Sequence, residues 1–227
     1  MEVNAWNIQK DFMRKNRGSN IFTAVHPCDF LLPAGKLTVV SGRSGGGKST
    51  LLNILSGILA PTSGRVCYDD QDIYALSDEK LSEFRNRHIG YIPQGKSAVS
   101  SLTVLENIML PLTLFGDRDD QEAMRLMELF EIAHLKDVLP NEMSGGELRR
   151  MAIARAMMRK PEVLFADEPT GDLDDQNTKL VFRVLRAAAD QGAAVMVVTH
   201  EGEAAGYADR VYRMDAGELD DGKKQNG

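Results

Sequence analysis

A glycine-rich stretch, GRSGGGKST from Gly42 to Thr50, brings together the residue types that hold phosphate groups in proteins. Gly42 and Gly47 are separated by four residues and are followed directly by Lys48 and Ser49. Glycines let the backbone curl so that successive N–H groups point at one anion, and Lys48 adds a mobile positive charge. The Ser49 hydroxyl can hold Mg²⁺ beside the outer phosphates. The residues expected to bind the phosphate chain are Gly42, Arg43, Ser44, Gly45, Gly46, Gly47, Lys48, Ser49 and Thr50.

The segments on either side of this stretch are those that a phosphate loop requires. The apolar run 37–40 predicts a buried strand before it, and the apolar spacing of 51–55 predicts an amphipathic helix after it. A helix beginning near Ser49 adds the positive end of its dipole to the site. The structural alternative is a flexible glycine turn. The Lys-Ser pair at the right offset favours a nucleotide phosphate site over that turn.

Two carboxylates follow the apolar run 163–166, which predicts another buried strand. In a protein with a phosphate loop the first, Asp167, would hold Mg²⁺ opposite Ser49, directly or through water. The second, Glu168, would polarise a water molecule for attack on the γ-phosphate. By itself an acidic pair after a strand is more often a solvated turn. The phosphate loop makes the catalytic interpretation the stronger one.

A second candidate anion site is the segment Met-Ser-Gly-Gly-Glu at 143–147. Ser144 and Glu147 are spaced as a capping box for the helix that follows, which is a purely structural role. The same geometry can bind phosphate, because the Ser144 hydroxyl and the N–H groups of Gly145 and Gly146 lie together at a helix N-terminus. Spacing alone leaves both interpretations open.

Apolar patterning along the chain predicts an α/β fold with a mostly parallel, doubly wound sheet and an antiparallel β region at the N-terminus. The expected strands are 3–12, 21–32, 37–40, 65–68, 89–92, 163–166, 193–198 and 210–214. After the phosphate-loop helix, the expected helices are 77–87, 104–114, 119–130, 146–158 and 177–189. Residues 14–20 are expected to form a hairpin turn, and the polar tail 220–227 to fray.

The helix-rich stretch 95–159 interrupts the alternation of strands and helices. We expect it to be a helical subdomain inserted into a nucleotide-binding core made of 1–94 and 160–227. The whole of 1–227 would then be one domain, which its length allows.

Composition narrows the class of protein. The 227 residues are 43% hydrophobic and 26% charged, which is ordinary for a globular protein. A net charge of −6 does not favour unspecific contact with nucleic acid or anionic lipid. Cys28 and Cys67 form no metal or redox pattern and suit a reducing cytosol. No signal peptide is expected, and the longest apolar run, 193–198, is too short to cross a bilayer. At a membrane, another chain would have to supply the spans.

Six ordered motifs, covering nearly the whole chain at the family's spacing, resemble those of ABC ATPases. They are the Walker A loop 42–49, the Q-loop Gln94, the signature at 144–147, the Walker B strand ending in Asp167 and Glu168, the D-loop 171–174 and the H-loop His200. Segments 61–64, 102–107 and 169–171 resemble the macrolide-exporter and lipoprotein-releasing branch of that family.

The resemblance implies ATP and Mg²⁺ as cofactors, and two copies packed head to tail, each signature closing over the γ-phosphate held by the other copy. It implies that Glu168 is the general base, while Lys48 and His200 stabilise the developing charge. Gln94 would touch Mg²⁺ and relay its state to a membrane partner. Phe12 stands where the family stacks an aromatic ring on adenine. Taken alone, His200 is more often an ordinary core or surface residue, and Phe12 also fits a strand core.

The sequence differs from the usual pattern of ABC ATPases at three places. Glu147 replaces the commoner Gln of the signature, with little expected effect because Ser144 and the glycines do the binding. Asp172 replaces the usual Asn of the D-loop, which bears on communication across the dimer. The polar segment GKSAVSS at 95–101 replaces the apolar residues usual after the Q-loop glutamine. That segment faces the permease in relatives, so the transported substrate is not inferred.

The predicted function is the ATP-hydrolysing subunit of an ABC transporter. It would be dimeric with ATP and would dock on a separate integral membrane permease at the cytoplasmic face of the cell membrane, with no nucleic acid as partner. The alternative is a non-transport ABC ATPase acting as a nucleotide-driven clamp in sensing, assembly or repair. Repair members usually carry long coiled-coil or zinc insertions, which are not apparent in this sequence. A nucleotide kinase is disfavoured, because it needs neither a signature nor an H-loop.

Overall fold

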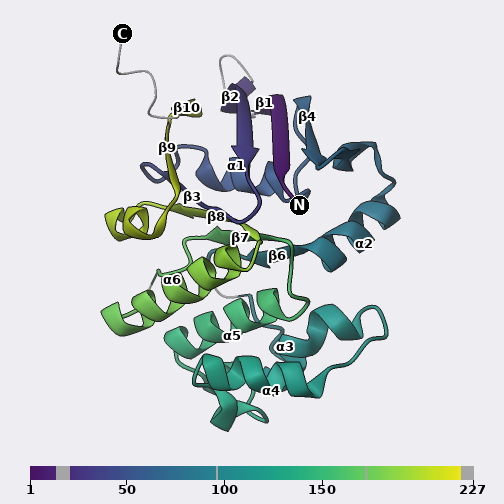
Figure 1. The fold of residues 1–227 in the computed structure, drawn as a ribbon, viewed down its shortest axis with the longest axis vertical. Helices are drawn as coiled ribbons and strands as arrows, with labels where there is room; N and C mark the ends of the chain where they lie inside the picture. Colours follow the sequence, from purple (N-terminus) through teal and green to yellow (C-terminus); the bar gives the residue numbers. More distant parts are fainter. Residues whose placement is uncertain (14–20, 96, 172, 221–227) are drawn as a thin grey trace.

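The computed structural model describes residues 1–13, 21–95, 97–171 and 173–220. Two β-sheets and the helices are arranged in layers (Figure 1). A four-stranded sheet and helix α1 (Lys48–Leu55) lie on one side of a six-stranded sheet, and helix α6 (Asp175–Asp190) and the helix-rich segment lie on the other. The hairpin turn predicted at 14–20 and most of the predicted tail lie outside the described residues.

The N-terminal sheet is antiparallel throughout and has the order β2-β1-β4-β5. Its strands are β1 (Val3–Met13), β2 (Ile21–Leu32), β4 (Ser63–Tyr68) and β5 (Gln71–Asp72). The expected antiparallel region is confirmed. Strand β5 was not predicted, because two polar residues are too short to show a period of two.

The six-stranded sheet has the order β10-β9-β3-β8-β7-β6. Its strands are β3 (Leu37–Ser41), β6 (Ile89–Ile92), β7 (Val163–Asp167), β8 (Ala194–Thr199), β9 (Arg210–Asp215) and β10 (Glu218–Asp220). All pairs are parallel except that of β9 with β10. The mostly parallel sheet is confirmed. The expectation that the chain frays from residue 220 is wrong at that residue, because Asp220 pairs with Arg213 in β10.

Strands β3, β7 and β8 are buried on both faces, which explains their unbroken apolar sequences. Val39 and Leu164 belong to a core shared with the helix-rich segment and α6. Their neighbours Val40 and Phe165 point the opposite way, into a core shared with α1 and the N-terminal sheet. Because side chains alternate along a strand, the central sheet separates two hydrophobic cores.

The helix-rich segment contains α3 (Val104–Thr113), α4 (Asp120–Leu129) and α5 (Gly145–Met157), which pack on one another. Helix α5 also contacts β6 and so joins this segment to the main sheet. Helix α2 (Asp78–His88) lies between β5 and β6 in the chain. Each predicted helix is present to within a few residues. The division of the chain into core and inserted subdomain stays a prediction.

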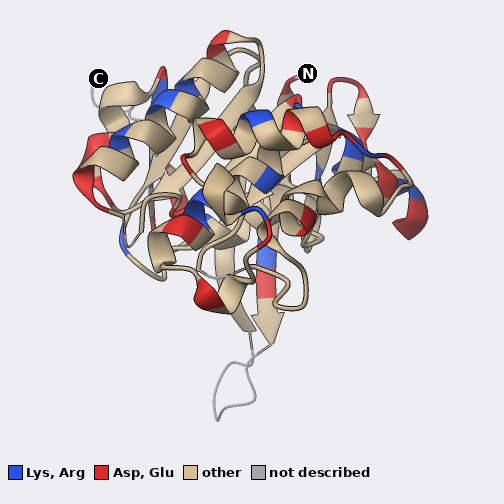
Figure 2. Ribbon diagram, turned by 90° about the horizontal axis from the view of Figure 1, so that it is seen from below, with Lys and Arg blue, Asp and Glu red and all other residues tan. Residues whose placement is uncertain are grey.

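Seen from below, the helices carry both acidic and basic residues (Figure 2). In the described ranges, no helix combines the length and the apolar character needed to cross a membrane.

Candidate active site

The phosphate loop joins the end of β3 to the start of α1 and depends on glycine at two positions. Gly42 has φ of 154° and Gly47 has φ of 101°, which are values that other residues rarely adopt. A Cβ atom on Gly42 would lie 1.9 Å from the carbonyl oxygen of Met214, and one on Gly47 would lie 2.3 Å from that of Ala24. Backbone from two other segments therefore lies close to the loop, and only glycine fits at these two positions.

The turn between β9 and β10 holds the same loop by hydrogen bonds. The N–H of Gly217 donates to the carbonyl oxygen of Gly46 at 3.0 Å, and the N–H of His26 donates to that of Gly217 at 2.9 Å. The loop is thus tied both to the C-terminal strands and to β2. Within it, Arg43, Ser44 and Gly45 are exposed, where a ligand could reach them.

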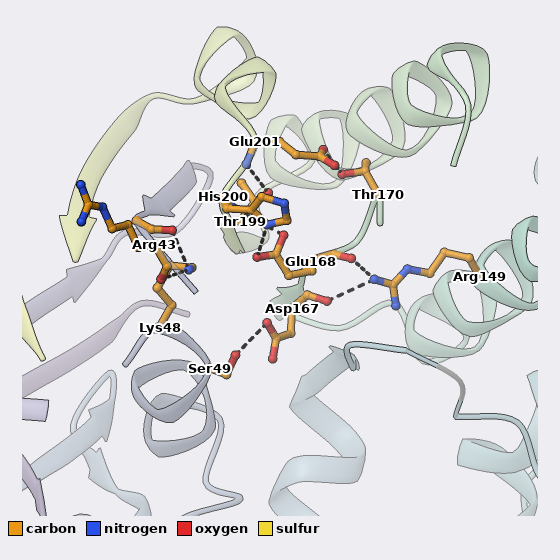
Figure 3. A network of polar contacts seen from close by, with 11 residues as sticks. Arg43, Lys48, Ser49, Arg149, Asp167, Glu168, Thr170, Thr199, His200 and Glu201 are labelled. Carbon is orange, nitrogen blue, oxygen red and sulfur yellow. Dashed lines mark hydrogen bonds and ion pairs between the residues drawn. The ribbon is translucent and has the colours of Figure 1, made fainter. Parts of the chain in front are cut away.

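Lys48 is the buried cation of the loop, with 6% of its surface exposed. Its Nζ donates to the carbonyl oxygens of Gly42 at 2.8 Å and Arg43 at 2.9 Å. These bonds hold the ammonium group inside the curve of the loop, as Figure 3 shows. An ammonium group held in this place is a ready partner for a phosphate anion.

Asp167 ends β7 opposite the first turn of α1. The Ser49 hydroxyl donates to its Oδ1 at 3.1 Å (Figure 3). Burial raises the pKa of Asp167, the Ser49 hydrogen bond lowers it, and the neighbouring charge of Glu168 raises it again. A carboxylate and a hydroxyl that meet at the end of a buried strand supply hard oxygen donors of the kind that Mg²⁺ prefers.

Glu168 follows directly in the left-handed region, with φ of 46°. Its N–H donates to the carbonyl oxygen of Val198 at 2.9 Å, so the parallel pairing of β7 and β8 continues one residue past Asp167. This pairing places Glu168 beside His200, and His200 Nδ1 lies 2.9 Å from Glu168 Oε1 (Figure 3). The hydrogen bond and charge of Glu168 raise the pKa of His200.

A family model described as ABC transporter matches residues 25–171. The chain belongs to the ABC transporter family. The lipoprotein-releasing system ATP-binding protein LolD of Syntrophotalea carbinolica is 38% identical over 221 residues, which cover 96% of each chain. The macrolide export ATP-binding/permease protein MacB of Chlorobaculum tepidum is 37% identical over 92% of this chain, which spans only 33% of that relative.

Among solved structures, a dimeric post-hydrolysis state of the ATP-binding cassette MJ0796 bound to ADP and Pi is similar to this fold. It has a TM-score of 0.88 at 30% identity, with 96% of both chains covered. The predicted α/β phosphate-loop fold and the predicted family are therefore confirmed. As a member of the ABC family, the chain is an ATP-binding ATPase.

The ABC signature lies at the start of α5, where the capping box is formed. The Ser144 hydroxyl accepts from the N–H of Glu147, whose carboxylate accepts from the N–H of Ser144 at 2.7 Å. Ser144 and Gly145 are exposed. Helices α1 and α5 pack into different cores, so the signature and phosphate loop of one chain lie on opposite sides of the main sheet (Figure 1). The structure does not bring the two predicted anion sites together.

Gln94 and Phe12 come from segments other than those that carry Lys48, Asp167 and Glu168. Gln94 is exposed just after β6. Phe12 lies in β1 with 39% of its surface exposed, and Lys10 Nζ is 5.4 Å from its ring centre. Contact of Gln94 with Mg²⁺ and stacking of Phe12 on adenine stay predictions.

Three polar residues that sequence reasoning missed also lie around this ABC site. Thr170 donates its hydroxyl hydrogen to Glu201 at 2.6 Å, and the N–H of Glu201 donates to the Thr199 hydroxyl at 3.0 Å (Figure 3). Arg149, on α5, donates to the backbone at the end of β7. Thr170 and Glu201 adjoin the motifs and could have been suspected. Arg149 could not, because its partners are carbonyl groups far along the chain.

Proposed function

We propose that this chain is the ATP-hydrolysing subunit of an ABC transporter, and that it works as a head-to-tail dimer driving a separate membrane permease. The observation that carries this proposal is the cluster at one edge of the main sheet. Lys48 and Ser49 come from the first turn of α1, Asp167 and Glu168 from the end of β7, and His200 from the end of β8.

The roles of these residues follow from their surroundings. Lys48, fixed inside the loop by two carbonyl groups, would neutralise the outer phosphates. Glu168, held against the end of β8, would accept a proton from the attacking water, and His200 would contact the γ-phosphate. The pairing of His200 with Glu168 is then expected to rearrange when the γ-phosphate and water arrive.

The residues present also fit Mg²⁺. Protein sites for this ion use one or two carboxylates together with substrate phosphates and water, because Mg²⁺ gives up its waters reluctantly. Asp167 and Ser49 supply such a partial set, and Gln94 is the third predicted ligand. Over the part of the chain that is described, His, Cys, Asp and Glu do not gather in threes or more as a complete metal cage would need. When bound, the ion would neutralise charge on the β- and γ-phosphates.

The position of the signature supports a dimer. Ser144 and Gly145 are exposed at a helix N-terminus, and α5 packs on the side of the main sheet opposite to α1, the helix that follows the phosphate loop. A γ-phosphate reaching this N-terminus must therefore be held by a second copy. The solved cassette MJ0796 is described as dimeric, which agrees with this arrangement.

The permease partner is supported by the two kinds of relative. The LolD relative is described as an ATP-binding protein of a lipoprotein-releasing system, and the MacB relative as a combined ATP-binding/permease protein. We propose that this chain acts on the cytoplasmic side of the cell membrane, bound to its inner face through the permease. The segment 95–101 after Gln94 is the proposed contact, and no nucleic acid is expected as partner.

The substitution Glu168→Gln tests both the catalytic and the dimer proposals. It keeps the shape of the side chain and removes its basicity, so hydrolysis should slow by ~10²–10⁴-fold while ATP binding survives. With ATP and Mg²⁺ this variant should elute as a dimer in size-exclusion chromatography, because ATP stabilises the closed state.

A second substitution separates the two proposals. Adding Ser144→Arg should return the Glu168→Gln variant to a monomer, while Ser101→Arg, an exposed control in the same segment of the chain, should not. A monomeric Glu168→Gln protein under saturating ATP would contradict the dimer. Hydrolysis at the wild-type rate would show that Glu168 is not the base.

A further inference from the structure

Arg149 is a buried cation in the second turn of α5, with 6% of its surface exposed. Burial of a guanidinium group is unfavourable unless its donors are satisfied. Its Nη1 donates to the carbonyl oxygen of Pro93 at 2.5 Å, and its Nε to that of Pro169 at 2.9 Å. Its Nη2 donates to the carbonyl oxygens of Asp167, at 3.2 Å, and Glu168. The side chain therefore binds backbone carbonyl groups that follow two neighbouring strands, β6 and β7, and Figure 3 shows its bonds at the end of β7.

These carbonyl groups belong to the backbone that carries the reacting side chains. Asp167, Glu168 and Pro169 are consecutive residues where the chain leaves β7. Pro93 follows β6 and precedes Gln94. Backbone carbonyl groups at a buried strand end need a donor, because the sheet no longer supplies one. A single guanidinium group with five N–H donors can serve several of them at once.

Glu168 is the residue most affected by this arrangement. Its φ of 46° is uncommon for a residue with a Cβ atom, and such a conformation persists only where the surroundings fix it. The N–H of Glu168 is held by Val198 of β8, and its carbonyl oxygen is held by Arg149 of α5. The peptide groups on both sides of its Cα atom are thus fixed, which sets the direction of the carboxylate.

We propose that Arg149 is a positioning residue for ATP hydrolysis: it holds the backbone of Glu168 in the left-handed conformation that aims the carboxylate at the attacking water. Because Arg149 belongs to α5, the aim of Glu168 then depends on where the helix-rich segment sits against the main sheet. The inference rests on the proposed function, in which Glu168 is the general base.

The test compares Arg149→Lys and Arg149→Gln with the wild-type protein. Neither side chain can replace four hydrogen bonds, so kcat for ATP hydrolysis should fall about 10–100-fold, the scale of a small misplacement of a reacting group. KM for ATP and the affinity for ADP should stay within about 3-fold, because the four carbonyl groups that Arg149 binds belong to Pro93, Asp167, Glu168 and Pro169, outside the phosphate loop. Wild-type kcat in either variant would overturn the proposal, as would loss of ADP binding together with kcat.

The control is Arg159→Gln. Arg159 lies near the end of α5, and its guanidinium group donates to the carbonyl oxygen of Pro111 at 3.1 Å and to Asp117 at 2.8 Å. Loss of this arginine should leave kcat within about 2-fold of the wild type. An equal fall in kcat would show that any arginine lost from this segment has the same effect, and the proposal would be wrong.

A double-mutant cycle with Glu168→Gln gives the readout that a purely structural role would not produce. If Arg149 acts through the Glu168 carboxylate, Arg149→Lys should slow single-turnover hydrolysis by less than about 3-fold in the Glu168→Gln background. If Arg149→Lys instead slowed the Glu168→Gln variant by the same factor as it slows the wild-type protein, the proposal would be refuted. If Glu168→Gln itself retained the wild-type rate, the proposed base would be wrong. If only Glu168→Gln were slow, the proposed function would stand and this inference alone would fall.

Discussion

His200 Nδ1 lies 2.9 Å from Glu168 Oε1, so the two side chains expected to act on the γ-phosphate are paired with each other. The backbone N–H of His200 also donates to Glu168 Oε2 at 3.4 Å. The side chain of Glu168 is 11% exposed and that of His200 is 64% exposed, so the pair lies at the surface of the site and an incoming ligand can reach it. Protonation of His200 should therefore bear on both stability and catalysis.

The first prediction concerns pH. The pKa of His200 is raised above 6.5 in the folded state by the hydrogen bond and charge of Glu168. A raised pKa contributes stability that is fully present below 6.5 and is lost as pH rises through the higher folded value. His200→Gln should therefore lower the Tm more at pH 6 than at pH 9. In the Glu168→Gln background the effect of His200→Gln should depend less on pH, because only the charge of Glu201 then still raises the pKa of His200. An equally strong pH dependence in that background would contradict the pairing of His200 with Glu168.

The second prediction concerns nucleotide binding. Lys48→Ala removes the buried ammonium group of the phosphate loop, so affinity for ATP should fall about 100-fold, the loss expected for a charge-assisted hydrogen bond. Isothermal titration calorimetry measures this directly. Lys36→Ala is the matched control, because Lys36 precedes the same strand β3 at its opposite end. Unchanged affinity in Lys48→Ala would show that Lys48 does not bind phosphate.

The third prediction concerns the segment 95–101. Arg155 of α5 donates to the carbonyl oxygen of Ser97 at 2.9 Å and to its hydroxyl at 2.6 Å. Ser97→Ala removes the hydroxyl contact and should loosen the segment. Basal ATPase activity should stay within about 2-fold. Stimulation by the reconstituted permease should fall.

Ser63→Ala, at an exposed position of β4 outside this segment, serves as its control and should leave the stimulation unchanged. An equal loss of basal and stimulated activity in Ser97→Ala would place this segment in the catalytic core.

The fourth prediction concerns Asp209, which joins the start of β9 to β3. Burial raises the pKa of Asp209, but hydrogen bonds from Arg186, the N–H of Leu37 and Lys36 outweigh it and bring the pKa to about 2. A lowered pKa contributes stability that is present above the ordinary value of 3.8 and is lost as pH falls toward 2. Asp209→Asn should therefore lower the free energy of unfolding by roughly 1–2 kcal/mol at pH 7.

Urea unfolding at pH 7 and pH 3 checks this. The difference in the free energy of unfolding between the wild-type protein and Asp209→Asn should be smaller at pH 3. The control is Asp190→Asn, because Asp190 also pairs with Arg186 but its side chain is 66% exposed. An exposed ion pair contributes little, so this variant should lose less than about 0.5 kcal/mol. Equal losses in the two variants would contradict the special role of Asp209.

The main sheet and the phosphate site could be predicted because their signals are local. Strands β3, β7 and β8 are apolar over their whole length, which only burial on both faces explains. The glycine loop and the capping box likewise lie within a few consecutive residues. Features that depend on contacts with distant parts of the chain could not be predicted from the sequence. Strand β10 is three residues long and exists through its pairing with β9, and Arg149 reads in the sequence as one more arginine on a helix.

Strand β9 and the turn that follows it hold the phosphate loop in place. This has a consequence for synthesis on the ribosome. Gly42 lies against Met214 and Gly46 is bonded to Gly217, yet the loop leaves the ribosome long before those residues do. Until then, β3 lacks its neighbour β9 and forms an open sheet edge, which is the part of a nascent sheet most prone to pair with other chains. The step that closes this edge also gives the loop its final shape, so capacity to hold a nucleotide and protection from aggregation are acquired together.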